Sequence, residues 1–126
     1  MAYNTISQLD FGQAIAQEDF TGKQYFLGVQ TGEEVVVAST AGGAANVVIH
    51  TDAPSGISVR TVFKGVTKVV AGDAVTAGDD VASDANGKVV TATTGDVVVG
   101  TAVTAASEDG EVMTINFFGD GRRDAS

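Results

Sequence analysis

The chain has 126 residues and a formal net charge of −9 at pH 7, from seven Lys or Arg and sixteen Asp or Glu side chains. This length predicts one domain with a modest core, and the acidic balance excludes nucleic acid as a partner, because phosphate binding needs clustered cations. The lack of cysteine excludes disulfides and thiolate metal sites, and no apolar run predicts a membrane span or an export signal.

The first 21 residues differ from the rest of the chain. They are rich in Gln, Asn, Asp and Ser, and their apolar residues follow no sustained period. We interpret residues 1–21 as an extended arm with at most a short helical turn, and the alternative is a frayed terminus. If the arm docks on a partner, its apolar side chains Ile6, Leu9 and Phe11 are the expected anchors.

A β domain is predicted over residues 22–118, followed by a polar tail over residues 119–126. Residues 57–64 alternate with a period of two, which is typical of a half-buried antiparallel strand. The expected apolar face consists of Ile57, Val59, Thr61 and Phe63, and the opposite face consists of Ser58, Arg60, Val62 and Lys64. Residues 111–117 repeat the pattern, with Met113, Ile115 and Phe117 on the apolar side.

Two shorter segments, residues 34–38 and 46–50, are more uniformly apolar. We expect them to be strands that are either buried on both faces or placed in an interface. The core must be built from small side chains, since aromatic residues make up only 6% of the chain and Trp is absent, so association with other copies would add buried area. The predicted oligomer-interface residues are Val35, Val36, Val37, Val47 and Ile49.

Tight turns separate the predicted strands. Asn86 and Gly87 supply the positive φ of a hairpin turn between residues 81–83 and 88–91, and residues 107–111 join the last two strands in the same way. Pro54 lies in a turn that closes one strand and opens the next. Helix signals are nearly absent beyond residue 21, so the predicted fold is all-β, a small barrel or sandwich with short strands.

No arrangement of residues predicts catalysis, a cofactor or a metal. His50 is the single histidine and lies in an apolar strand, where one imidazole without a matched nucleophile or further ligands supports neither a triad nor a zinc site. Asp79, Asp80 and Asp84 lack the alternate spacing and terminal Glu of a calcium loop, so we interpret them as turn residues.

The order of these segments resembles the small capsid decoration, or cement, proteins of tailed bacteriophages. The resemblance covers residues 25–118 and is carried by TGEEVVVASTAGG, TDAPSG, GVTKVVAGDAV, GDDVASDANGK and VGTAVTAASEDGE, which begin at positions 31, 51, 65, 78 and 99. It implies a protein without enzymatic activity that binds the outside of the mature head and holds neighbouring major capsid subunits together, commonly as a trimer.

The resemblance also implies a location on the exterior of the capsid after synthesis in the host bacterial cytoplasm. The expected partners are the major capsid protein and further copies of the chain, with no nucleic acid and no membrane. An arm suits this role, because an extended segment can add a strand to an exposed sheet edge. The alternative function is a β-rich adhesive or carbohydrate-binding module similar to a head fibre.

Overall fold

A computed structural model describes residues 10–118 and 123–124, and these residues form strands and turns without a helix. The strands are β1 (Asp10–Ala16), β2 (Leu27–Thr31), β3 (Glu34–Val37), β4 (Val47–Ile49), β5 (Ser58–Val70), β6 (Asp80–Ser83), β7 (Val89–Thr91), β8 (Val97–Val98), β9 (Gly100–Ala102), β10 (Val112–Phe117) and β11 (Arg123–Asp124). The all-β prediction is confirmed.

The first half of the chain closes into a five-stranded barrel, here called the upper barrel. Its strands follow the order β1-β3-β2-β4-β5, and antiparallel pairing of β1 with β5 closes the ring. β1 runs parallel to β3 and antiparallel to β5, so both of its edges are paired. Closure in this way removes the free strand edges that would otherwise pair with other chains.

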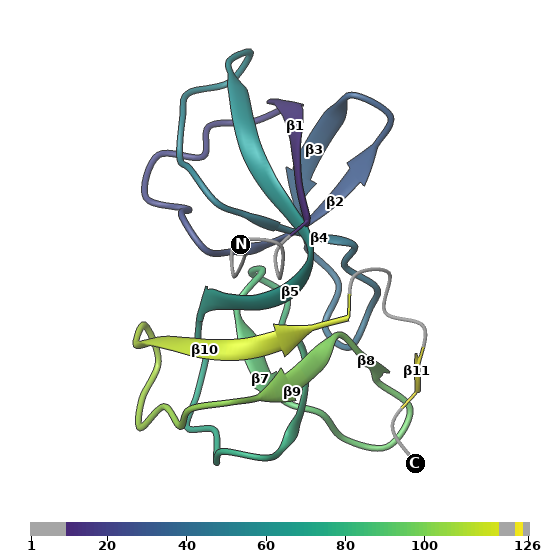
Figure 1. Ribbon diagram of the computed structural model, residues 1–126, viewed down its shortest axis with the longest axis vertical. Coiled ribbons are helices and arrows are strands. Elements are labelled where there is room, and N and C mark those ends of the chain that lie inside the picture. Colours follow the sequence, from purple (N-terminus) through teal and green to yellow (C-terminus); the bar gives the residue numbers. More distant parts are fainter. Residues whose placement is uncertain (1–9, 119–122, 125–126) are drawn as a thin grey trace, which may run out of the picture.

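The second half, here called the lower half, continues the same sheet in the order β5-β10-β9-β6-β7. A single parallel bridge from Ala71 to Val89 brings β7 back beside the end of β5. The Gly72 N–H donates to the Val89 carbonyl at 2.8 Å beside this bridge. Figure 1 shows the two halves stacked along the long axis, with β5 running from one into the other.

β5 is the strand that both halves share. Its first part pairs with β1 and β4, and its second part pairs with β10. Gly65 lies between the two parts with φ +120°, a conformation that residues with a Cβ rarely adopt. Figure 1 shows β5 bending as it passes from one half to the other. Its pairing with β10 begins at Gly65, which opposes Phe117.

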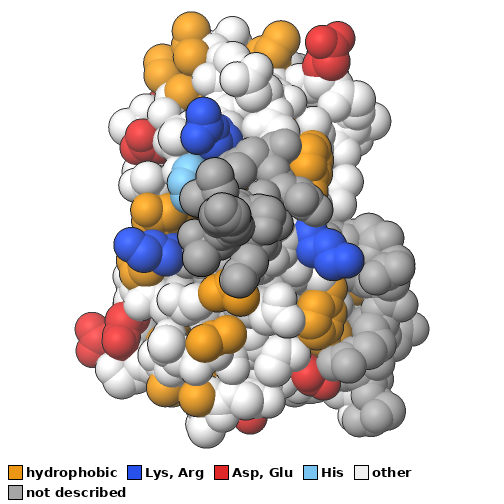
Figure 2. Space-filling view, viewed as in Figure 1, with side chains coloured by type: hydrophobic (Ala, Val, Ile, Leu, Met, Phe, Trp, Pro, Cys, Tyr) orange, Lys and Arg blue, Asp and Glu red, His pale blue; other side chains and the backbone are white. Residues whose placement is uncertain are grey.

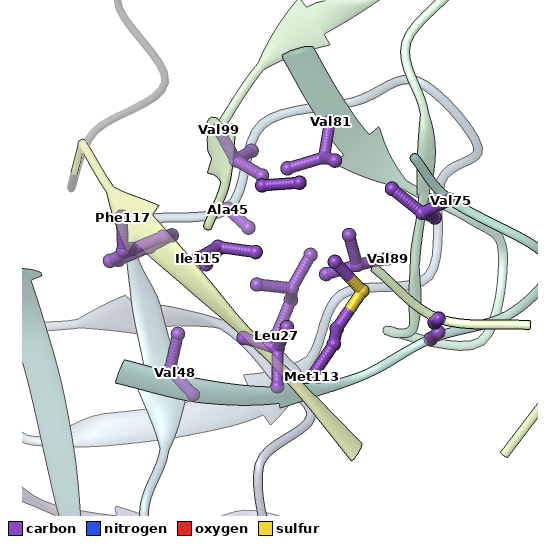
Figure 3. Packing of buried hydrophobic residues seen from close by; sticks show 14 of the residues in the cluster. Leu27, Ala45, Val48, Val75, Val81, Val89, Val99, Met113, Ile115 and Phe117 are labelled. Atoms are coloured by element: carbon purple, nitrogen blue, oxygen red, sulfur yellow. The ribbon is translucent and has the colours of Figure 1, made fainter. Parts of the chain in front are cut away.

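Two apolar cores lie on either side of the shared wall formed by β2, β4 and β5. The upper core includes Phe20, Phe26, Val35, Val47, Ile49 and Val59. The lower core includes Leu27, Val48, Val62, Val89, Met113, Ile115 and Phe117. Figure 3 shows side chains of the lower core pointing toward a common centre from β2, β7 and β10. Small β-branched residues dominate both cores, as the composition predicts.

The predicted turns are present. β6 and β7 form an antiparallel hairpin, and Gly87 in its turn has φ +81°. β9 and β10 pair antiparallel on either side of the turn at residues 107–111, and Pro54 lies between β4 and β5. β4 is fully buried on both faces, as predicted, whereas β3 alternates between exposed and buried residues.

Two predictions need correction. Residues 10–16 of the predicted arm form β1, and Phe20 is fully buried, so this part of the chain belongs to the barrel. The predicted two-faced pattern of residues 57–64 also fails, because Val62 on the expected polar face is fully buried, while Ile57 and Phe63 on the expected apolar face are 52% and 38% exposed. Val62 is buried because β5 lies between two cores.

Candidate binding surface

An open groove of about 470 Å³ lies between the segment after β1, the end of β3 and the turn between β6 and β7. The Glu18 carboxylate accepts a hydrogen bond from the Val37 N–H at 2.8 Å. The Lys23 ammonium lies 4.9 Å from the centroid of the Phe26 ring. Glu18 therefore ties the segment after β1 to β3, and Lys23 packs on a ring of its own segment, which makes a structural role the simplest interpretation.

Asp19, also in this groove, has a similar local role. Its carboxylate accepts hydrogen bonds from the hydroxyl and the N–H of Thr21, and these bonds lower the pKa of Asp19 below its ordinary value. Among the residues that the structure describes, no group of three or more His, Asp or Glu side chains is arranged to hold a metal ion. In the same residues, no helix is long and apolar enough to cross a membrane.

A different set of residues gathers where the two halves meet. We call Tyr25, His50, Arg60 and Lys68 the junction cluster. The Tyr25 and His50 rings meet edge to face with centroids 5.8 Å apart, and the Lys68 ammonium lies 6.0 Å from the Tyr25 centroid. Arg60 and Lys68 are exposed, and Tyr25 and His50 are half-buried. The cluster combines two cations with two partly covered rings at the surface.

The junction cluster is fixed by backbone hydrogen bonds. The His50 N–H donates to the Arg60 carbonyl at 2.8 Å, and the Gln24 side-chain amide donates to the His50 carbonyl at 3.1 Å. Burial lowers the pKa of His50, and the positive charges of Arg60 and Lys68 lower it further. The imidazole is therefore neutral at pH 7, and the positive charge of the cluster comes from Arg60 and Lys68.

Tyr25 has φ +71°, which makes it the non-glycine residue with positive φ in the described part of the chain. Such a conformation costs a bulky residue about 1–3 kcal/mol and persists only where the surroundings impose it. The Tyr25 N–H donates to the Ile49 carbonyl at 2.6 Å, and its carbonyl accepts from the Val70 N–H at 3.2 Å. These two bonds tie Tyr25 to the ends of β4 and β5.

Charge is unevenly distributed over the strands. β5 carries Arg60, Lys64 and Lys68, and none of β5, β9 and β10 contains an aspartate or a glutamate. Figure 2 shows the histidine beside Lys or Arg side chains on one face, with the Asp and Glu side chains in view toward the margins. A chain of net charge −9 thus presents a local surface of the opposite sign.

The predicted interface residues occupy different environments. Val35, Val47 and Ile49 are fully buried in the upper core of a single chain, so burial within the monomer already explains their apolar character. Val36 is 40% exposed on β3 and Val37 is partly buried. Of the five residues, these two are accessible to a second chain.

The structure describes one of the three predicted arm anchors. Ile6 and Leu9 lie outside the described residues. Phe11 lies in β1, where its backbone opposes Val62 of β5. The backbone at Phe11 is therefore part of the barrel.

Sequence reasoning missed the junction cluster as a site. Arg60 and Lys64 stand out in the strand pattern, and the absence of acidic residues from the segments around them was a readable signal. Nothing in the sequence indicated that Tyr25 adopts a positive φ beside His50, because that conformation depends on hydrogen bonds to two distant strands.

Comparisons with known proteins agree with this architecture. No curated protein matches the sequence. The structure is similar to the crystal structure of the N base of the head fiber gp8.5 of bacteriophage phi29, with a TM-score of 0.69 and 19% identity over 94% of this chain and 98% of that chain. This likeness shows a shared fold. The sequence pattern of the phage cement protein family matches residues 12–117. The chain therefore belongs to the phage cement protein family and is a capsid decoration protein of the phage head.

Proposed function

We propose that the protein binds the outer surface of the mature head and stabilises the lattice of the major capsid protein, without catalytic turnover. The observation that carries this proposal is the family match, which spans residues 12–117 and therefore both the upper barrel and the lower half. A compact domain with a closed barrel suits a clamp, because the strands of the upper barrel are paired on both edges and do not offer a free edge for aggregation. Many equivalent sites on one shell make modest individual contacts sufficient.

The test uses expanded heads that lack this protein, prepared from the phage in which the chain occurs. The temperature of head disruption is measured with and without saturating protein. A ligand that binds only the assembled shell stabilises it by mass action, so we expect the disruption temperature to rise. Binding without any rise would instead indicate display or adhesion, as in a head-fibre-like module, and absence of binding would overturn the proposal.

We further propose that the protein acts as a homo-oligomer, with a trimer as the expected state. Val36 supports this proposal because it is an exposed aliphatic side chain on β3. Val36→Lys places a charge at this position, so the oligomer should dissociate at a higher protein concentration than the wild type does, while the monomer stays folded. Light scattering during size exclusion measures this effect. A monomeric wild type at high micromolar concentration would contradict the proposal.

Residues 1–9 retain the proposed role of a docking arm, with Ile6 and Leu9 as its anchors. A truncation that begins at Asp10 keeps every described strand, so it tests docking separately from folding. We expect the truncated protein to fold and to bind heads more weakly than the full chain. Full head binding by the truncated protein would refute the arm as a docking element.

A further inference from the structure

The open groove beside β3 contains a short stretch of that strand that extends past β1. Pairing of β1 with β3 stops at Ala16 and Val35, and the Glu18 carboxylate takes the next place by accepting from the Val37 N–H at 2.8 Å. A charged side chain in such a place protects a strand edge from uncontrolled pairing. The Val37 carbonyl points to the same edge as its N–H, so the groove also presents a backbone acceptor.

The walls of the groove combine aliphatic and charged side chains. Val36 is 40% exposed, and Ala85 lines the groove from the β6–β7 turn. Two carboxylates, those of Glu18 and Asp19, stand against one cation, Lys23. An extended segment with aliphatic side chains and without carboxylates therefore suits this groove, because it covers Val36 and adds no negative charge.

Residues 1–9, the proposed arm, have this composition. They contain no charged side chain, and they carry the aliphatic residues Ile6 and Leu9. They also contain no Pro and no Gly, the residues that most disfavour an added strand. An extended segment of this kind can bind along a strand edge through its backbone while alternate side chains fill the pocket beside it.

The two arm anchors of a chain cannot reach that chain's own groove. β1 runs from Asp10, which lies beside Lys64 of β5, to Ala16, two residues before Glu18 of the groove. The six steps of β1 span about 20 Å, at about 3.3 Å per residue. Ile6 lies four residues before Asp10, so it extends at most about 14 Å from that residue, and Leu9 at most about 4 Å. Anchors in this groove must therefore come from another copy.

We propose that the arm of one copy lies in the groove of the next copy, with Ile6 and Leu9 against its aliphatic wall and a backbone N–H of the arm donating to the Val37 carbonyl. The inference rests on the homo-oligomer proposed above and assigns its contacts. Arm and groove are different surfaces, so the contact is head-to-tail, and such contacts close into a ring where the rotation between copies allows it. Three copies closed in this way form the proposed trimer.

This arrangement also accounts for the expected weaker head binding of a chain that begins at Asp10. A ring contacts the shell through several copies at once, which raises its overall affinity, and a chain without the arm loses that gain.

The test uses thiols introduced into a chain that has no cysteine of its own. Full-length Ile6→Cys and Leu9→Cys are each mixed with full-length Val36→Cys at a dilution where the oligomer dissociates, then concentrated and oxidised. The matched control replaces Val36→Cys with Val103→Cys, because Val103 is a valine of similar exposure, 50%, in the lower half and outside the groove. The mixed disulfide-linked dimer is identified by mass.

We expect about tenfold more mixed dimer with Val36→Cys than with Val103→Cys for at least one arm position, because thiols held together in a complex react at a high effective concentration. A chain that begins at Asp10 provides a measurement without thiols. Light scattering should show that its dissociation constant for self-association is about tenfold or more above that of wild type, because two buried aliphatic anchors are lost.

The outcomes separate this inference from the proposals on which it rests. Equal amounts of mixed dimer with Val36→Cys and Val103→Cys, or wild-type self-association by the truncated chain, would overturn this inference alone. Weaker head binding by a truncated chain that self-associates normally would assign the arm to the shell and would also overturn it. A wild type that is monomeric at high micromolar concentration would remove the proposed homo-oligomer as well.

Discussion

The upper barrel and the lower half share β5 but are closed by different means. Backbone pairing of β1 with both β3 and β5 closes the upper barrel. Among the described residues, the lower half is closed between β5 and β7 only by the Ala71–Val89 bridge. Its core is completed by Leu27, Val48 and Val62 from the strands of the upper barrel. The lower half thus depends on the upper barrel for its walls.

Removing β1 should have the largest effect on this arrangement. Deletion of residues 1–21 removes β1 and the buried side chain of Phe20, which leaves β3 and β5 with unpaired edges. We expect loss of cooperative folding in both halves, because the walls of the lower core come from the opened barrel. Deletion of residues 1–9 is the control and should keep a cooperative melt by circular dichroism. A cooperative melt of the 1–21 deletion near that of the control would contradict this dependence.

Truncation of one phenylalanine in each core sharpens the comparison. Phe20 and Phe117 are both fully buried, in the upper and lower cores respectively. Phe20→Ala and Phe117→Ala should each lower the free energy of unfolding by about 3–5 kcal/mol, measured by urea titration. Hydrogen exchange should distinguish them: Phe117→Ala leaves β1 and β3 protected, while Phe20→Ala exposes amides in both halves. Equal protection patterns would argue against the asymmetry.

The strands and turns were predictable wherever a local signal determines them. Residues 112–117 alternate strictly, and Met113, Ile115 and Phe117 are all buried, because one face of β10 packs on the lower core. Asn86 and Gly87 likewise form the expected hairpin turn. The family resemblance was also accessible from the sequence and is confirmed by the match over residues 12–117.

Features that depend on long-range pairing were not predictable from these signals. The first strand contains Gly12, small residues and polar residues, so its apolar pattern is weak, yet its pairing with β3 and β5 makes it part of the barrel. Val62 is buried because two cores flank one strand, a situation that a two-faced pattern does not represent. The junction cluster joins residues from positions 25 to 68, which only the closed topology brings together.

Contact between the halves can be loosened at the β6–β7 turn. Gly87 has φ +81°, and its carbonyl accepts from the Leu27 N–H at 2.7 Å. A Cβ at Gly87 would lie 2.5 Å from Val37 Cγ1 and 3.0 Å from the Leu27 carbonyl oxygen. Gly87→Ala therefore combines strain in φ with a clash between the halves.

The matched control is Gly95→Ala, because Gly95 has φ +94° but open space around its Cβ position. We expect thermal and urea unfolding to show a loss of about 1–2 kcal/mol for Gly95→Ala from backbone strain. Gly87→Ala should lose a further 1–3 kcal/mol, roughly the cost of overpacking. Equal losses at the two positions would show that the turn does not press on the upper barrel.

The smallest expected effect is a pH dependence at the junction. Burial, Arg60 and Lys68 hold the pKa of His50 below its ordinary value of 6.5, and Tyr25 packs against its ring. The unfolded chain therefore binds a proton more readily than the folded chain. The stability contributed by neutral His50 is complete above the unfolded pKa and is lost as the pH falls through the lowered folded pKa. The free energy of unfolding, measured by urea titration, should be lower at about pH 5.5 than at about pH 7.5 in wild type. Both values lie above the ordinary pKa range of most carboxylates, so these groups contribute little to the difference. His50→Gln should reduce it, and an unchanged pH dependence in that variant would place the responsible group elsewhere.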